Sequence, residues 1–357
     1  MKKYNFYAGP AILPASVMAE AAQSVVDFNG SGLSILEISH RSKECIAMLE
    51  ETEALVHELL GIGDDFAVLF LGGGASSQFY MIPHNLLAEN KKAGYVDTGS
   101  WSSKAIKEAK FYGQTEVLAS SKDKNYSYIP KGYAIPEDLA YLHLTSNNTI
   151  FGTQFQDFPE TAVPVICDMS SDIFSKPLDM SKFDLIYAGA QKNLGPAGAT
   201  LVIIRRALLE KTARSMPTML NYKTHIDVQS SYNTPPVFPI YVSMLTLRWL
   251  KANGGLTAME AKNKVKGQIL YEEIDRNPLF KGVAAKEDRS LMNVNFVLSE
   301  ENGQLEKEFL AACKAAGCIG LEGHRSVGGF RASIYNAMPK EGVEMLVSVM
   351  QDLASKH

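Results

Sequence analysis

The sequence has few cysteines: its 357 residues include only Cys45, Cys167, Cys313 and Cys318. These four form no Cys-x-x-Cys pair and no Cys/His cluster with the spacing of zinc ligands, so we expect no metal site. They are also too few and too widely spaced to form a disulfide framework. We therefore predict free thiols and a cytoplasmic protein.

Long apolar runs are also lacking. No segment approaches the roughly 18 consecutive apolar residues that a membrane-spanning helix needs. The N-terminal segment is interrupted by Asn5, Gly9 and Pro10 before an apolar core of signal-peptide length can form. The 35 Lys and Arg residues are nearly balanced by 39 Asp and Glu residues, and both signs are interspersed along the chain. We therefore expect neither a membrane nor a nucleic-acid partner.

What the sequence does contain is an ordinary globular composition, with 46% hydrophobic and 21% charged residues. Short apolar segments recur along its first two thirds, and helix-like segments such as Ser77–Ala88 and Ser102–Tyr112 separate several of them. The segments expected to be strands are Phe66–Leu71, Gly94–Val96, Glu116–Leu118, Tyr141–Leu144, Val163–Cys167, Phe183–Tyr187 and Ala199–Ile204. This alternation predicts an α/β protein with a largely parallel sheet covered on both faces.

The pattern changes after Pro235-Pro236, where two long amphipathic segments cover Phe238–Ala252 and Leu256–Asp275. A compact βαβα unit is expected beyond them, formed by Leu291–Leu298, Gln304–Ala316, Phe330–Tyr335 and Glu341–Leu353. This predicts a large domain at residues 16–255 and a smaller α/β domain at residues 256–357. Residues 1–15 could pack against either domain, and we assign them to the smaller one.

Lys192 is the first candidate for chemistry. It lies in the sequence Ala-Gly-Ala-Gln-Lys-Asn, which directly follows an apolar strand, and the glycine lets the backbone approach a ligand closely. A desolvated lysine amine is a nucleophile that forms Schiff bases with carbonyl cofactors. The alternative is a surface lysine in a turn between strands, which is the commoner situation for a lysine.

Asp168 supports the first interpretation, because it ends the apolar segment that begins at Val163. Open α/β sheets bind ligands at the carboxyl ends of their strands. A carboxylate at that edge can keep the pyridinium nitrogen of pyridoxal phosphate protonated, which makes the ring an electron sink. The alternative is an acid that caps a helix or a turn.

Two further segments could contact such a cofactor. The run Gly72-Gly-Gly-Ala-Ser-Ser follows a strand and begins a helix, and backbone N–H groups at such a turn bind phosphate. Its spacing fits neither a dinucleotide-binding motif nor a P-loop, and a plain tight turn is an equal alternative. Trp101 follows another strand and could stack on a flat ring, although tryptophans are more often part of the core.

Three basic groups remain, namely the pairs His40-Arg41 and His324-Arg325 and the single Arg331. Arginine binds carboxylates and phosphates through two parallel hydrogen bonds, and histidine can add a further donor. Together these residues suggest a dianionic substrate. Surface salt bridges are the alternative for each pair.

On these segments the chain resembles the phosphoserine aminotransferase family, whose members are fold-type I pyridoxal phosphate enzymes. The similar segments are Asn5–Ala11, Ser39–Glu44, Tyr187–Gly198, Asn233–Pro236, Trp249–Gly255 and Gly323–Met338. The resemblance implies a mostly parallel seven-stranded sheet between helices, with a smaller C-terminal α/β domain. It also implies transfer of the amino group of L-glutamate to 3-phosphohydroxypyruvate, giving O-phospho-L-serine and 2-oxoglutarate by a ping-pong mechanism. The family serves serine biosynthesis and often pyridoxine biosynthesis as well.

The resemblance implies roles around the cofactor, pyridoxal 5′-phosphate. Lys192 would form the Schiff base and move the proton from Cα to C4′ of the cofactor, and Asp168 would pair with the ring nitrogen. Trp101 would stack on the ring, and Thr149 would contact its phenolic oxygen. The residues implied to hold the cofactor phosphate are Ala75, Ser76 and Gln191 of one subunit with Asn233 and Thr234 of a second. A site shared in this way requires a homodimer.

The resemblance also implies how the substrates are bound. Arg331 would bind the α-carboxylate. The distal phosphate or carboxylate would be bound by His40, Arg41, His324 and Arg325. Some members of the family carry an arginine in the glycine turn, where this chain has Ser76, so a direct arginine contact to the substrate is absent there.

Three alternatives compete with this assignment. Two are other fold-type I pyridoxal phosphate enzymes, namely an alanine–glyoxylate-type aminotransferase and a cysteine desulfurase. Cys313 and Cys318 lie in no recognisable reactive loop, which disfavours the desulfurase. The third is a binding or regulatory protein that keeps the fold without chemistry, and the presence of Lys192 and Asp168 disfavours it.

Overall fold

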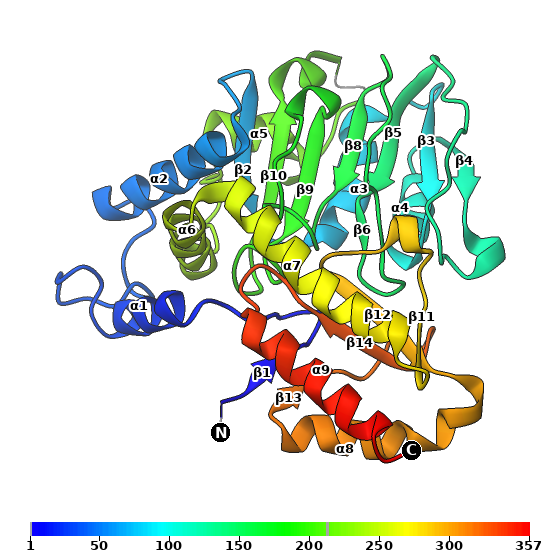
Figure 1. The fold of residues 1–357 in the computed structure, drawn as a ribbon. Helices are drawn as coiled ribbons and strands as arrows, with labels where there is room; N and C mark the ends of the chain where they lie inside the picture. The colour runs from blue at the N-terminus through cyan, green and yellow to red at the C-terminus, as the bar shows by residue number, and fades with distance from the viewer. Residues whose placement is uncertain (1, 212–213) are drawn as a thin grey trace.

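A seven-stranded sheet dominates the computed structural model, which describes residues 2–211 and 214–357 (Figure 1). In spatial order its strands are β2 (Phe66–Leu71), β10 (Thr200–Arg205), β9 (Leu185–Gly189), β8 (Val165–Asp168), β5 (Leu139–Thr145), β3 (Lys92–Asp97) and β4 (Gln114–Ser120). Strand β10 is antiparallel to both of its neighbours, β2 and β9, and the other neighbours pair in parallel. The prediction of a mostly parallel α/β sheet is therefore confirmed.

Helices cover both faces of this sheet, as expected because its central strands are buried along their length. Alternate side chains of β2 show the two faces: Val68 and Phe70 belong to one buried cluster, and Leu69 belongs to another. The helices packed in the first cluster are α1 (Ala15–Val26), α2 (Lys43–Leu60) and α6 (Val237–Ala252), together with Leu256 and Met259 from the first turns of α7 (Gly255–Arg276). Those packed in the second are α3 (Ala75–Leu86), α4 (Ser100–Ala109) and α5 (Tyr222–Asp227).

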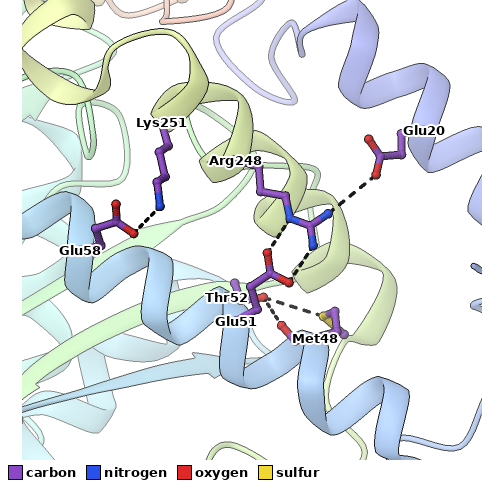
Figure 2. Close-up of polar contacts among 7 residues, drawn as sticks. All are labelled: Glu20, Met48, Glu51, Thr52, Glu58, Arg248 and Lys251. Atoms are coloured by element: carbon purple, nitrogen blue, oxygen red, sulfur yellow. Dashed lines mark hydrogen bonds and ion pairs between the residues drawn. The ribbon is translucent and has the colours of Figure 1, made fainter.

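Charged side chains connect the helices of the first face at their solvent-exposed edge (Figure 2). Arg248 of α6 donates two hydrogen bonds to Glu51 of α2, at 2.6 and 2.7 Å, and lies 3.9 Å from Glu20 of α1. One turn further along α6, Lys251 contacts Glu58 at 2.7 Å. Exposed pairs of this kind contribute at most about 1 kcal/mol each, so apolar burial holds the helices together and the charges fix their alignment.

A second, smaller unit is built from residues near both ends of the chain (Figure 1). Its three-stranded antiparallel sheet contains β11 (Phe280–Gly282), β12 (Asn293–Leu298) and β14 (Phe330–Ser333), and β1 (Tyr4–Asn5) pairs with β13 (Cys318–Ile319). Its helices are α7 (Gly255–Arg276), α8 (Glu306–Ala315) and α9 (Lys340–Ala354). Tyr4 and Phe6 pack into the same buried cluster as these elements, which supports our proposal that residues 1–15 and 256–357 form one domain.

Short elements complete the chain. Strands β6 (Asn147–Asn148) and β7 (Thr153–Gln154) form a small hairpin beside the large sheet. The 3-10 helices are η1 (Lys122–Lys124), η2 (Met180–Lys182), η3 (Arg206–Lys211), η4 (Thr218–Leu220), η5 (Lys286–Asp288) and η6 (Glu300–Leu305). Within the described residues, no helix is both long and apolar enough to span a membrane.

Element boundaries differ from the predicted ones for local reasons. The helix predicted from Ser77 begins at Ala75, because Gly74 makes the preceding turn with a φ of 72°. The strand predicted from Val163 begins at Val165, because Pro164 has no N–H to donate to a neighbouring strand.

Candidate functional site

Two adjoining cavities lie at the carboxyl ends of the central strands. The inner cavity, of about 140 Å³, is lined by Ala75, Ser76, Trp101, Asp168, Gln191 and Lys192 among others. The outer cavity, of about 470 Å³, is lined by Trp101, Thr149, Gln191, Lys192, His324, Arg325 and Arg331 among others. Trp101, Gln191 and Lys192 belong to both walls, so the two cavities form one site.

Lys192 follows β9 by three residues and contributes its amine to this shared wall. Its Nζ donates a 2.8 Å hydrogen bond to Thr149 Oγ1 and lies 5.7 Å from the centre of the Trp101 ring. Burial lowers the pKa of the Lys192 amine to about 8, an effect that Asp168 opposes and Arg331 reinforces. A fraction of the amine is therefore unprotonated near neutral pH, as a nucleophile requires.

The loop that carries Lys192 is held from two sides. The carbonyl of Gln191 accepts a 2.9 Å hydrogen bond from the N–H of Ala11, in the N-terminal segment. On the other side, Asn193 donates to the carbonyl of Ile173 at 3.2 Å and accepts from the N–H of Asn336 at 3.0 Å. Segments distant in sequence thus fix the backbone on either side of the lysine.

Asp168 is the last residue of β8 and lines the inner cavity with only 5% of its surface exposed. Its Oδ1 accepts a 2.9 Å hydrogen bond from the N–H of Ser170. Burial raises the pKa of the Asp168 carboxyl, while the bonds from Ser170 and the charge of Lys192 act in the opposite direction. The bond to Ser170 is the turn contact that the alternative interpretation expects, but the carboxyl also faces a cavity that contains an amine.

The inner cavity has features that fit pyridoxal phosphate. Ala75 and Ser76 begin α3, and the first N–H groups of a helix have no partners within the helix. Such N–H groups bind phosphate. Trp101 Nε1 and Thr145 Oγ1 line the same cavity and are buried without a hydrogen-bond partner. A polar ligand would satisfy these groups between the buried acid and the amine.

The outer cavity is positively charged. Arg331, on β14, reaches the carbonyl of Thr149 with Nη1 at 3.5 Å, while its buried Nε has no partner. Burial lowers the pKa of His324, and the nearby Arg331, Arg325 and Lys104 lower it further. Within residues 2–211 and 214–357, no carboxylate forms an ion pair with His324, Arg325 or Arg331. The surface salt bridges of the alternative interpretation are therefore absent from this group, which is free to bind an anion.

Four predicted residues line neither cavity of the single chain. Asn233, Thr234 and Arg41 are exposed, and His40 is partly buried in the segment that joins α1 to α2. The structure thus brings the other predicted site residues together, including His324 and Arg325, but not these four. Asn233 and Thr234 are the two predicted to act from a second subunit, whereas His40 and Arg41 are predicted beside His324 and Arg325 with no subunit assigned. Their roles stay predictions.

Several residues of the site were missed in the sequence. Lys104 lines the outer cavity and lies one helical turn after Trp101, so helical spacing could have indicated it. Ala8 and Gly9 also line that cavity, although they lie far from the other residues in sequence. Thr145 and Asn147 also line the inner cavity, at the end of β5 and in β6, without any motif that would single them out.

The chain is similar to known proteins over nearly its whole length. The sequence pattern of the aminotransferase class-V family matches residues 3–346. The phosphoserine aminotransferase of Flavobacterium psychrophilum is 60% identical over 357 residues, which cover all of both chains. The solved phosphoserine aminotransferase of Bacillus circulans subsp. alkalophilus matches with a TM-score of 0.96 and 48% identity, over 99% of each chain. The pyridoxal phosphate-bound phosphoserine aminotransferase of Trichomonas vaginalis matches with a TM-score of 0.93 and 38% identity, over 98% of this chain and 100% of that chain.

Proposed function

The chain belongs to the aminotransferase class-V family, and on that premise we propose that it is a phosphoserine aminotransferase with pyridoxal phosphate as its cofactor. It exchanges an amino group between L-glutamate and 3-phosphohydroxypyruvate, giving 2-oxoglutarate and O-phospho-L-serine for serine biosynthesis. The observation that carries the proposal is the continuity of the two cavities. A nucleophilic amine and a buried acid in the inner cavity face unpaired arginines in the outer one.

Pyridoxal phosphate, when bound, supplies the electron sink for a substrate that loses its Cα proton. Asp168 would hold the ring nitrogen, Trp101 would stack on the ring and Thr149 would contact the phenolic oxygen. The cofactor phosphate would lie against Ala75, Ser76 and Gln191. Lys192 Nζ would take the proton from the substrate Cα and deliver it to C4′ of the cofactor, a role that its lowered pKa favours.

The outer cavity would bind both substrates in turn. Arg331 lies beside Lys192 and Thr149, and its unpartnered Nε is free for the α-carboxylate that both substrates share. His324 and Arg325 would meet the distal carboxylate of glutamate or the phosphate of the partner substrate. Charge-assisted hydrogen bonds are stronger than neutral ones, which suits a site that must bind two substrates with two anionic groups each.

We also propose that the protein works as a homodimer whose active sites are shared. Asn233 and Thr234 would reach the cofactor phosphate of the neighbouring subunit, and the same subunit would bring His40 and Arg41 to the distal anion. The same segments carry exposed apolar side chains, namely Val26, Leu33, Leu36 and Tyr232. Exposed apolar patches are typical of surfaces that a partner covers.

The buried cysteines bear on the alternatives and on location. Burial raises the pKa of all four thiols, and a cysteine desulfurase needs a reactive, exposed thiolate. The chain therefore suits an aminotransferase better. Four free cysteines in one chain also support a reducing, cytoplasmic location.

The direct test of the activity is amino transfer from O-phospho-L-serine to 2-oxoglutarate, followed as glutamate formed. L-alanine with glyoxylate and L-cysteine serve as comparison substrates for the two competing enzymes. We expect kcat/KM for O-phospho-L-serine to exceed that for L-alanine by at least about 100-fold, with no sulfide released from cysteine. Faster transfer from alanine to glyoxylate, or sulfide release, would contradict the proposal.

Mixed dimers test the sharing of sites. If Thr234→Ala and Lys192→Ala subunits are assembled together, one site of each heterodimer carries both defects and the other carries neither. Activity should therefore return on mixing two impaired proteins. Heterodimers proven by two different affinity tags that recover no activity would count against shared sites.

A further inference from the structure

Lys104 is a charged residue of the outer cavity that the functions assigned above do not use. It lies on α4, one turn after Trp101, and its side chain is exposed. Its Nζ lies 4.4 Å from the centre of the Trp101 ring. Within the described part of the chain, no carboxylate forms an ion pair with Lys104, so its charge is not neutralised.

The contact with Trp101 is weak enough to be exchanged for a better one. A cation over an aromatic ring at an exposed site is only weakly stabilised, because water competes for the cation. Lysine also has a flexible four-carbon stem, so its ammonium can move by several ångströms without any backbone change. An anion that enters the outer cavity would therefore compete successfully with the ring for this ammonium.

The other cations of the cavity lie within electrostatic range of Lys104. His324 has a lowered pKa, caused first by burial and then by the charges of Arg331, Arg325 and Lys104. These cations face one cavity from both units. Lys104 lies on α4 of the large unit, His324 and Arg325 lie between β13 and β14 of the small unit, and Arg331 lies on β14. A ligand that bridges from Lys192 outward would meet all of them.

We propose that Lys104 contacts the distal phosphate of the phosphorylated substrate and makes the enzyme prefer it over substrates with a distal carboxylate. The inference rests on the proposed phosphoserine aminotransferase activity. A phosphate carries about −1.5 to −2 charges against one for a carboxylate. A mobile extra cation at the mouth of the cavity therefore gains more from the phosphate than from glutamate.

The test compares Lys104→Met, Lys104→Arg and Lys107→Met in single half-reactions of the holoenzyme. Lys107 lies on the same helix and is exposed, but it lines neither cavity, so its removal controls for lost charge on α4. We expect Lys104→Met to lose about tenfold in kcat/KM for O-phospho-L-serine and less than about twofold for L-glutamate, as for one partly exposed charge-assisted contact. Lys104→Arg and Lys107→Met should stay close to the unaltered enzyme.

Inorganic phosphate gives a second readout that needs no turnover of a phosphorylated substrate. As a competitive inhibitor of the glutamate half-reaction, inorganic phosphate should bind about tenfold more weakly to Lys104→Met than to the unaltered enzyme. This difference should become smaller at high salt, because salt screens exposed charges. Equal losses of kcat/KM for both amino acids in Lys104→Met would mean that Lys104 only supports Trp101. Unchanged kcat/KM values would mean that Lys104 does not contribute to substrate binding. Either result would overturn this inference and leave the proposed function intact. Failure of the unaltered enzyme to accept O-phospho-L-serine would instead overturn the proposed function, and this inference with it.

Discussion

Thr149 Oγ1 accepts a 2.8 Å hydrogen bond from Lys192 Nζ, while the backbone carbonyl of the same threonine lies 3.5 Å from Arg331 Nη1. Thr149 thus contacts both the amine proposed to perform the chemistry and the arginine proposed to hold the α-carboxylate. It lies just after the short strand β6, beside the shared wall of the two cavities. Its hydroxyl should therefore matter for the reaction rather than for folding.

Thr149→Val should lower kcat about tenfold, because it removes a hydroxyl that orients the amine and would contact the cofactor. Thr149→Ser keeps the hydroxyl and should restore most of the rate. The measurement is the single-turnover rate with saturating L-glutamate, together with a thermal melt of each variant. A valine variant as fast as the original would show that the hydrogen bond is incidental.

The lowered pKa of Lys192 predicts how cofactor capture depends on pH. Only the unprotonated amine attacks a carbonyl, so capture of pyridoxal phosphate by cofactor-free protein should be slow at pH 6, rise through pH about 8 and then level off. A lysine at its ordinary pKa of 10.5 would still be accelerating at pH 10. Stopped-flow absorbance across this range measures the profile.

Two neighbours should move this midpoint in opposite directions. Asp168 raises the pKa of Lys192, so Asp168→Asn should shift the midpoint to lower pH; Arg331 lowers it, so Arg331→Gln should shift the midpoint to higher pH. Identical midpoints in all three proteins would show that the charges in the site do not control the amine.

Asp168→Asn should also lower the rate of amino transfer by about 100-fold or more, because the cofactor ring nitrogen would lose the anionic partner that we propose for it and the ring would accept electrons poorly. The variant should still bind the cofactor, since Ala75, Ser76 and Gln191 are unchanged. Asp157→Asn, an exposed acid outside both cavities, is the matched control. Full activity of Asp168→Asn would show that the Asp168 carboxylate serves only its turn contact with Ser170.

Substitution of Arg331 and of Arg325 should affect kcat/KM for the two amino-acid substrates differently. Arg331→Gln should weaken L-glutamate and O-phospho-L-serine alike, by about one to two decades in kcat/KM, because both carry the α-carboxylate. Arg325→Gln should affect O-phospho-L-serine more strongly, because its distal group carries more charge. Half-reaction kinetics with both amino acids distinguish these patterns. The reverse pattern would mean that Arg325 binds the α-carboxylate and Arg331 binds the distal anion.

Much of the fold could be predicted from the sequence, because the central strands are buried on both faces and therefore consist of continuous apolar segments. Phe66–Leu71 was predicted with its observed bounds for this reason. Helices α1 and α2 were not predicted individually, although Ser42 caps α2 by accepting from the N–H of Cys45 at 3.2 Å and Glu44 lies in its first turn. Their apolar faces alone did not distinguish them from an irregular segment beside the sheet.

Some residues of the site could likewise be predicted from the sequence, and others could not. Lys192 and Asp168 could be recognised because each lies at or shortly after the carboxyl end of a buried strand, where polar residues meet ligands. Lys104 could not be recognised from charge alone. Helical spacing could have placed it beside Trp101, but that it lines the outer cavity depends on how α4 packs. His40, Arg41, Asn233 and Thr234 cannot be placed by one chain at all if, as we propose, they act in the neighbouring subunit.

The central claim is that Lys192 binds pyridoxal phosphate in a site that accepts both glutamate and phosphoserine. The visible absorption spectrum of the purified protein, titrated separately with L-glutamate and O-phospho-L-serine, tests it most directly. We predict a visible band from the bound cofactor that both amino acids bleach, with 2-oxo acid released in proportion, and no such conversion in Lys192→Ala. A protein without this band after reconstitution, or one whose band O-phospho-L-serine leaves unchanged, would contradict the account.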